Sequence, residues 1–186
     1  MRRTELFSEL LGITLGDGNI GSYPRCNYLR IYCNPRQNQY IEYVGEILRK
    51  FFKKRPYRYF RRDASVVYLE ISLKNLEVLL GIKVGSKIRN RSTMPKWIFK
   101  KRSHLKACLR GLFDTDGSIY ITGGKYKIVN FTSHNPVLLR DIKKSLQLLH
   151  FNPYSKPGCV ELARKLEIVR FFKEIKPSNL RHHRFD

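Results

Sequence analysis

Hydrophobic residues along the chain follow two alternating periods, one typical of helices and one typical of strands. Apolar positions three or four residues apart predict amphipathic helices, and β-rich runs in which apolar and polar residues alternate predict strands. The helical spacing covers residues 4–16, 39–52, 73–82, 103–115, 136–150 and 166–175. The strand pattern covers residues 20–23, 28–33, 57–61, 66–71, 118–122, 126–132, 152–156 and 159–162.

The order of these elements is the same in the two halves of the chain. Each half reads helix, strand, strand, helix, strand, strand, helix. This order predicts an α+β fold with antiparallel sheets, built from two αββαββα repeats that are related by a pseudo-twofold axis. Residues 83–101 contain Gly85, Pro95 and several basic residues, a composition typical of a connecting segment. We therefore expect a first repeat at 1–84, a linker at 85–101 and a second repeat at 102–186.

A nine-residue phrase occurs once in each half, where the first predicted helix of that half ends. It reads LLGITLGDG at residues 10–18 and LRGLFDTDG at residues 109–117. Small residues let two helix backbones approach closely. Glycines that only stop a helix would explain one copy, but two matching copies favour a contact between the two helices at the pseudo-twofold axis. The small residues that would form this interface lie four positions apart in each copy: Gly12 and Gly16, Gly111 and Thr115.

The same contact would bring Asp17 and Asp116 together at the C-terminal ends of the two helices. Helix C-termini carry partial negative charge and the two carboxylates repel each other, so this placement is unfavourable unless a cation lies there. Oxygen ligands and a phosphate-rich partner favour Mg²⁺, which Mn²⁺ would be able to replace. Such ions activate water and stabilise the leaving oxygen in phosphodiester hydrolysis. The alternative is that both aspartates only form Asp-Gly turns into the following strands.

The charge of the chain indicates a polyanionic partner. It has 37 Lys and Arg against 15 Asp and Glu, a formal net charge of +22. Hydrophobic residues make up 42%, including 11 Tyr and 11 Phe, which is enough to build a packed core. A folded domain with this excess of basic residues favours nucleic acid, because each cation near a phosphate releases counterions. A ribosome-associated or merely highly charged surface is the alternative.

Other classes of protein fit the sequence less well. No apolar run approaches the ~20 residues of a membrane span, and the first residues do not resemble a secretory signal. The four cysteines, Cys26, Cys33, Cys108 and Cys159, form no Cys-x-x-Cys pair, so they indicate neither a zinc site nor a disulfide framework. We expect buried thiols in a reducing compartment and an intracellular, cytoplasmic protein.

The two phrases resemble the LAGLIDADG motif of homing endonucleases, in the single-chain form with two motifs. The resemblance covers nearly the whole chain, because residues 85–87 (GSK) and 94–98 (MPKWI) are similar to the passage between the repeats of archaeal and intein-borne members. It implies two sheets that form a saddle in the major groove of double-stranded DNA. It also implies a monomer with pseudo-dimeric symmetry and a long, asymmetric target.

The resemblance assigns roles to individual residues. The last acidic residue of each motif binds the metal ions, which gives Asp17 and Asp116, and the adjoining Gly16 and Thr115 are included in the metal site. Asp114 lies at the motif's other acidic position, where the first copy has Leu15, so a capping or structural role suits it better. The remaining candidates are one basic and one polar residue for each half: Lys87 and Asn34 in the first half, Arg181 (or His182) and Ser133 in the second. Lys87 could instead be a linker cation on a phosphate, and Asn34 or Ser133 could be a helix N-cap.

Alternation along the predicted strands indicates which side chains read the DNA. In the strand at 28–33, Leu29, Ile31 and Cys33 share one face, and the other face carries tyrosine and arginine. A strand of this kind is expected to bury one face and present the other to a partner. The candidate DNA-binding residues are Arg25, Tyr28, Arg30, Tyr32, Arg58, Arg61, Tyr68, Glu70, Ser72, Tyr120 and Lys127.

The leading hypothesis is a Mg²⁺-dependent, site-specific endonuclease that cuts both DNA strands, with one aspartate for each strand. The main alternative is a protein of the same fold that binds nucleic acid without cutting it, such as a maturase that assists intron splicing. Both motifs keep their aspartate, which favours cleavage. A transcription regulator is disfavoured, because the sequence has no helix-turn-helix with a basic recognition helix and no zinc finger.

Overall fold

The first repeat folds around a four-stranded antiparallel sheet. In the computed structural model, which describes residues 3–62, 65–179 and 181–182, strands pair in the order β1-β2-β4-β3. The elements of this repeat are α1 (Glu5–Gly16), β1 (Gly18–Tyr23), β2 (Cys26–Cys33), α2 (Asn38–Phe52), β3 (Tyr57–Arg61), β4 (Val66–Leu73) and α3 (Leu76–Leu80).

The second repeat has the same architecture, and its sheet has the equivalent order β5-β6-β8-β7. A short 3-10 helix, η1 (Lys96–Lys100), precedes it. Its elements are α4 (Arg102–Asp116), β5 (Gly117–Thr122), β6 (Tyr126–Thr132), α5 (Pro136–Leu148), β7 (Tyr154–Lys156), β8 (Cys159–Leu162) and α6 (Lys165–Ile175). The predicted α+β fold of two repeats with antiparallel sheets is confirmed.

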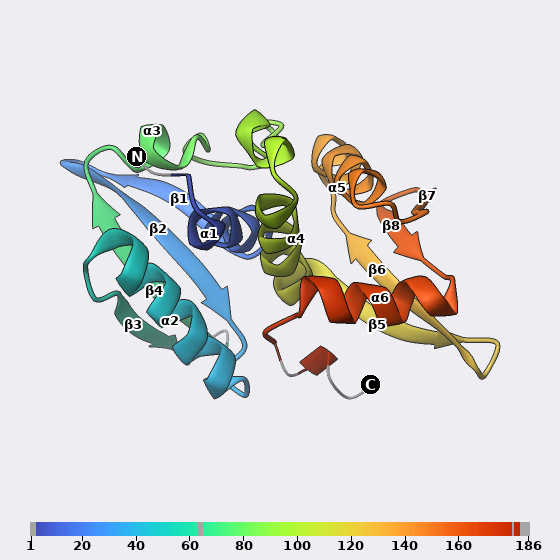
Figure 1. The fold of residues 1–186 in the computed structure, drawn as a ribbon. Helices are drawn as coiled ribbons and strands as arrows, with labels where there is room; N and C mark the ends of the chain where they lie inside the picture. The colour runs from blue at the N-terminus through green and yellow to red at the C-terminus, as the bar shows by residue number, and fades with distance from the viewer. Residues whose placement is uncertain (1–2, 63–64, 180, 183–186) are drawn as a thin grey trace.

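Helices α1 and α4 lie side by side in the centre of the molecule, with one sheet on either side of them (Figure 1). Their backbones approach so closely that side chains do not fit between them. A Cβ atom added to Gly12 would lie 2.2 Å from the carbonyl oxygen of Cys108, and one added to Gly111 would lie 2.4 Å from that of Glu9. The structure therefore brings together the small residues of the two phrases, since Gly16 likewise faces the side chain of Thr115.

Each sheet buries one face against helices and leaves the other face open. In β2, Leu29, Ile31 and Cys33 are buried, whereas Tyr28, Arg30 and Tyr32 are only half-buried on the opposite face. This is the alternation that the sequence predicts. We call the two faces that point away from the helices the open faces.

Three details differ from the sequence-based prediction. The helix predicted at 73–82 is the shorter α3, because β4 continues to Leu73 and Gly81 ends the helix with a left-handed φ of 68°. The predicted linker contains η1 and contributes Met94 and Ile98 to the core, so it is a packed segment. The four cysteines are unpaired as expected, but Cys26 and Cys159 are only half-buried.

Within the described part of the chain, no helix has the length and apolar character needed to cross a membrane.

Candidate active site

The two motif aspartates meet where α1 and α4 end. Asp17 caps the C-terminus of α1, and Asp116 is the last residue of α4. The carboxylate of Asp116 reaches the end of the other helix, since its Oδ2 lies 3.4 Å from the position of a Cβ on Gly16. Both aspartates are half-buried. The contact between the helices therefore creates a pair of carboxylates at the pseudo-twofold axis.

The surroundings of the pair disfavour its negative charge. Burial raises the pKa of Asp17 above its ordinary value, and the positive charges of Arg181 and Lys87 oppose this shift. Burial, followed by the charge of Asp17, raises the pKa of Asp116 to about 6. Two carboxylates that repel each other at helix C-termini form a site that a cation would stabilise.

A basic side chain binds the end of each motif helix. The ammonium group of Lys87 donates hydrogen bonds to the carbonyl oxygens of Gly16 and Thr14, the latter at 3.3 Å. The guanidinium group of Arg181 donates to the carbonyl oxygens of Thr115 and Gly117, the latter at 3.2 Å. The contacts with the carbonyl oxygens of Gly16 and Thr115 are equivalent under the pseudo-twofold axis, and each places a cation where the helix dipole is negative.

Each of these cations faces the aspartate of the other helix. Lys87 shares a surface hollow with Asp116 and Ser133, and Asp116 is the nearby charge that most strongly raises its pKa, although burial lowers the pKa overall. Asp17 and Asn34 line a second hollow, and a third hollow brings Asn34 together with Arg181. We call these groups the Asp116 half-site (Asp116, Lys87, Ser133) and the Asp17 half-site (Asp17, Arg181, Asn34). The assignment of Lys87 to the first half and of Arg181 to the second was therefore wrong. Each cation binds the end of one motif helix and faces the aspartate of the other.

The polar candidates, Asn34 and Ser133, lie in turns that follow β2 and β6. Asn34 is exposed and its Oδ1 accepts a hydrogen bond from the amide of Arg36 at 2.9 Å. Ser133 Oγ accepts one from the amide of Asn135 at 3.1 Å. The helix N-caps are Gln37 and Asn135. Asn34 and Ser133 are thus not N-caps, and both line a half-site.

The donor set fits a hard cation that keeps part of its water shell. Among the described residues, no group of three or more His, Cys, Asp and Glu side chains could hold a metal. Ligands would therefore be the carboxylates of Asp17 and Asp116, together with water, phosphate and backbone oxygen. Mg²⁺ is commonly bound in this way, through one or two carboxylates and a substrate phosphate. The carbonyl oxygens of Gly16 and Thr115, included in the predicted metal site, accept hydrogen bonds from Lys87 and Arg181.

Asp114 lies inside the protein, where it has a structural contact. It is 1% exposed, and its carboxylate accepts hydrogen bonds from the amides of Ser178 and Asn179 at 3.0–3.1 Å. Burial raises its pKa to about 7 although both amides oppose this shift. Sequence reasoning missed Asn179, because a single asparagine in a C-terminal segment gives no signal of its partner. His182 is buried against Phe113, and its Nε2 accepts a hydrogen bond from Arg181 Nε at 3.0 Å.

The open face of the first sheet carries a cluster of aromatic and charged side chains. Arg30 lies over the rings of Tyr28 and Tyr68, 4.3 and 4.8 Å from their centroids. Its Nε donates to Glu70 at 2.7 Å, and Tyr23 also donates to this carboxylate at 3.2 Å. Glu70 is 5% exposed, so the prediction that it reads a base directly is replaced by a role in orienting Arg30. Tyr32 and Ser72 lie on the same face by register with Tyr68 and Tyr28.

The arginines predicted to bind DNA lie in different places. Arg25 is exposed in the turn between β1 and β2. Arg61 lies on the open face of β3, two residues beyond Tyr59, which pairs with Tyr68. Arg58 pairs with Leu69, on the face that the helices cover, and forms an ion pair of 2.8 Å with Glu42 of α2. This position on the helix side of the sheet does not support the predicted contact of Arg58 with DNA.

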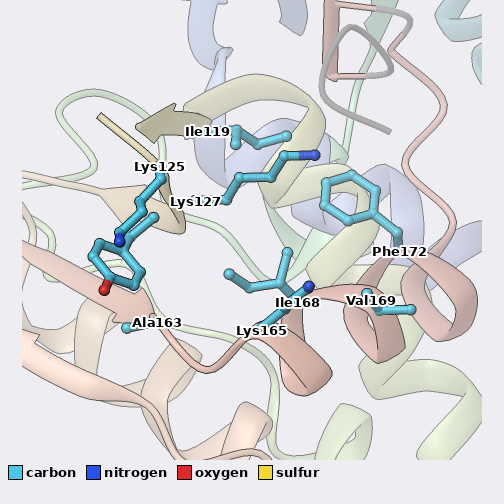
Figure 2. A pocket seen from close by; sticks show the side chains of 9 residues that line it. Ile119, Lys125, Lys127, Ala163, Lys165, Ile168, Val169 and Phe172 are labelled. Atoms are coloured by element: carbon cyan, nitrogen blue, oxygen red, sulfur yellow. The ribbon is translucent and has the colours of Figure 1, made fainter. Parts of the chain in front are cut away.

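The second sheet repeats the buried carboxylate of the first. Tyr120 lies on its open face and donates to Glu161 at 2.7 Å, and Lys156 pairs with the same carboxylate at 2.7 Å. Lys127 pairs with Ile121, on the side of the helices, where it lines a cavity of about 410 Å³ with Ile119 and Phe172 (Figure 2). The position of Lys127 on the helix side does not support its predicted contact with DNA; the sequence predicts no face for this strand, because it does not alternate cleanly.

Comparisons with known proteins agree with this geometry. The model of the family described as "LAGLIDADG-like domain" matches residues 103–176. Variants of the homing endonuclease I-DmoI have a similar structure, with a TM-score of 0.64 and 15% identity over 92% of this chain and 94% of theirs. The homing endonuclease I-LtrWI bound to its target DNA has a TM-score of 0.58 and 14% sequence identity, over 97% of this chain and 87% of its own. The N-terminal LAGLIDADG domain of DUF199/WhiA has a TM-score of 0.57 and 16% sequence identity, over 92% of this chain and 82% of its own. No curated protein matches the sequence.

The chain is thus a LAGLIDADG-fold protein in its single-chain form with two motifs. Residues 103–176 match the LAGLIDADG-like domain, and the fold of the described chain is similar to that of I-DmoI and I-LtrWI. The resemblance given by the two nine-residue phrases is confirmed.

Proposed function

We propose that this protein is a site-specific endonuclease that cuts both strands of a DNA target with a divalent cation, Mg²⁺, which Mn²⁺ can replace. The observation that carries the proposal is the pair of half-sites on the pseudo-twofold axis. Each contains a half-buried aspartate, a basic side chain and a polar side chain, which is one set for each strand. Structures of I-DmoI with DNA and Ca or Mn, and of I-LtrWI with its target DNA, support this assignment.

The residues of the chain divide the chemistry between them. A divalent cation, when bound, would supply an activated water and would stabilise the leaving oxygen. Asp17 and Asp116 would hold it, and their repulsion would fall when it binds. Lys87 and Arg181 place positive charge near the phosphate, which stabilises the negative charge that develops during hydrolysis. Asn34 and Ser133 hold water at the edge of each half-site.

The open faces support a long, asymmetric target. Their chemistry differs, since the first presents the cluster of Arg30, Tyr28 and Tyr68 and the second presents Tyr120 and Lys156. We expect the two faces to lie in the major groove of successive DNA segments, with the protein acting as a monomer. The net charge of +22 supports binding to the backbone of each segment.

A protein that binds nucleic acid without cutting it is the second candidate. The observation that favours it is the presence of the same fold in the N-terminal domain of WhiA, so that the fold alone does not decide the activity. A maturase that assists intron splicing belongs to this class. The two retained aspartates favour the endonuclease.

Cleavage of a randomised target library tests the two candidates. The purified protein is incubated with the library in Mg²⁺, Mn²⁺ or a chelator, and selected targets are then cloned into a supercoiled plasmid. We expect linear product with either ion and none with chelator. Asp17→Asn and Asp116→Asn should keep DNA binding and lose cleavage, whereas Glu46→Gln, at an exposed position of α2, should cut normally. An aspartate variant that cuts as the wild type does would rule out the proposed mechanism.

A further inference from the structure

Two segments far apart in sequence carry the basic residues to the half-sites. Lys87 lies in the segment between the repeats, and Arg181 lies in the segment that follows α6. Neither segment belongs to a regular helix or strand near its basic residue, apart from a single short turn at residues 181–182. Side-chain contacts therefore add to the few backbone bonds of these segments, such as that from the amide of Gly85 to the carbonyl oxygen of Ile20 at 2.9 Å.

The segment of Arg181 is held by Asp114. This carboxylate is 1% exposed and accepts the amides of Ser178 and Asn179. Asn179, also 1% exposed, returns a hydrogen bond from its Nδ2 to the carbonyl oxygen of Asp114 at 3.0 Å. The segment and the end of α4 are thus joined by bonds in both directions, and the two bonds between Asp114 and Asn179 are buried.

Asn179 also forms hydrogen bonds with Arg181 and with the first repeat. Its Oδ1 accepts the amide of Arg181 at 3.2 Å, and its Nδ2 also donates to Oε1 of Gln37, the N-cap of α2, at 3.2 Å. The ring of His182 completes the support by accepting from Arg181 Nε. The guanidinium group is consequently directed to the carbonyl oxygens that it binds beside the axis.

The segment of Lys87 is held by a different residue, Asn135. This side chain is 3% exposed, and its Nδ2 donates to the carbonyl oxygens of Ser92 at 2.6 Å and of Lys87 at 3.5 Å. Asn135 is the N-cap of α5, the position that Gln37 occupies in α2. The segment is also held by Asp141, whose carboxylate accepts the amide of Met94 at 2.8 Å. In the first motif, the position equivalent to Asp114 is the buried Leu15.

We propose that Asp114 is a positioning residue for cleavage of one DNA strand, because it fixes the segment that delivers Arg181 to the Asp17 half-site. Asn135 has the equivalent role for the other strand, through Lys87 and the Asp116 half-site. The inference rests on the proposed endonuclease function. Its consequence is that the two cleavages can be slowed separately by substitutions at residues other than the two aspartates that would hold the cation, although Asn135 also lines the hollow of the Asp116 half-site.

The test measures the cutting rate of each strand. A target duplex carries a different label on each strand, and Lys87→Met and Arg181→Met first show which strand depends on which cation. Asp114→Leu copies the residue of the first motif and removes the acceptor. We expect it to slow the strand that depends on Arg181 by at least about tenfold and the other by less than twofold, since supporting residues of this kind typically contribute 10–100-fold. A nicked intermediate should accumulate.

Two further variants complete the pattern. Asn135→Ser keeps a hydroxyl that can cap α5 but loses the amide donor, and it should slow only the strand that depends on Lys87. Asp114→Asn keeps one acceptor oxygen and should restore part of the rate lost in Asp114→Leu. If Asp114→Leu slows both strands equally, slows neither, or slows the strand of Lys87, the proposal is wrong. Asn179→Ala replaces Asp114→Leu if the latter does not fold, with the same expected strand preference.

Hydrogen exchange separates this inference from the proposed function. In wild type, the amides of Ser178 and Asn179 should be protected from exchange, and Asp114→Leu should remove that protection while the amides of Lys87 and Ser92 stay unchanged. This result does not require cleavage. Failure of the wild type to cut any DNA would reject the endonuclease, whereas unchanged protection in Asp114→Leu would reject the positioning role.

Discussion

Replacing Gly12 by alanine tests whether the close approach of α1 and α4 is essential. In an open helix position this change is favourable, because alanine has the higher helix propensity by about 1 kcal/mol. At Gly12 the new Cβ would lie 2.2 Å from the carbonyl oxygen of Cys108 and 3.0 Å from the amide nitrogen of Leu112. Both are backbone atoms, so no side-chain rotation relieves the overlap, and the helices must separate by about 1 Å to reach ordinary contact near 3.4 Å.

The net effect follows from these two opposing contributions. Overpacking of a tight interior costs about 1–3 kcal/mol, and an overlap between two backbones belongs at the upper end of that range. After the gain in helix propensity, we expect Gly12→Ala to lower the free energy of unfolding by about 2 kcal/mol. For a chain of this length that corresponds to a fall in Tm of about 4–8 °C.

Gly45 of α2 provides a matched control. A Cβ at Gly45 meets only Leu69 Cδ1, at 3.8 Å, so alanine fits without movement. Gly45→Ala should therefore raise the free energy of unfolding by about 0.5–1 kcal/mol. Both variants are measured by thermal and urea unfolding in the presence of chelator. If Gly12→Ala is as stable as Gly45→Ala, the packing of the two motif helices does not depend on small residues, and our account of the phrase fails.

Three further predictions concern the charges. Asp116→Asn should stabilise the protein in chelator above pH 6. The pKa of Asp116 in the wild type is raised from 3.8 to about 6, so between these values the native state keeps a proton that the unfolded state has lost. The free energy of unfolding of the wild type therefore falls as pH rises through this window, by at most about 3 kcal/mol. Thermal unfolding of both proteins between pH 4 and 8 checks this, and a constant difference in Tm would contradict it. Glu70→Ala should lower the free energy of unfolding by about 1–3 kcal/mol, because the guanidinium group of Arg30 loses its charged acceptor. Urea unfolding of the double variant Glu70→Ala/Arg30→Met should show that most of this loss of stability disappears. Arg25→Met should reduce the slope of log Kobs for DNA against log salt by about 1, whereas Arg58→Met, on the helix side of the sheet, should leave the slope unchanged. Equal slopes for the two variants would mean that our assignment of the faces is wrong.

Much of the fold could be predicted from local patterns. The alternation in residues 28–33 gave the correct buried face because each apolar residue there is flanked by tyrosine or arginine. Residues 73–82 were harder, since the same apolar residues satisfy the end of a strand and the start of a helix. The faces of Arg58 and Lys127 could not be predicted, because their strands do not alternate cleanly and only the pairing register fixes such a strand.

The site was predictable only where it repeats. Two copies of the phrase identified the aspartates, and the mismatch between Leu15 and Asp114 indicated a structural role for Asp114. The exchange of Lys87 and Arg181 across the axis could not be predicted, because sequence proximity associates each cation with its own repeat. Asn179 and Asn135 were missed for a related reason, since each acts through backbone groups of a distant segment, and backbone groups leave no trace in a sequence.

The crossing of the two cations has a consequence for how such chains can be recombined. Suppose the second repeat, from η1 onward, is exchanged for that of another protein with this fold. Asp17 then shares its half-site with the foreign residue that replaces Arg181, and the foreign residue that replaces Asp116 shares its half-site with the native Lys87. Neither half-site is inherited intact, so a chimera contains two hybrid sites instead of one native and one foreign site. Recombination that preserves both chemistries must carry the aspartate of one repeat together with the cationic segment of the other.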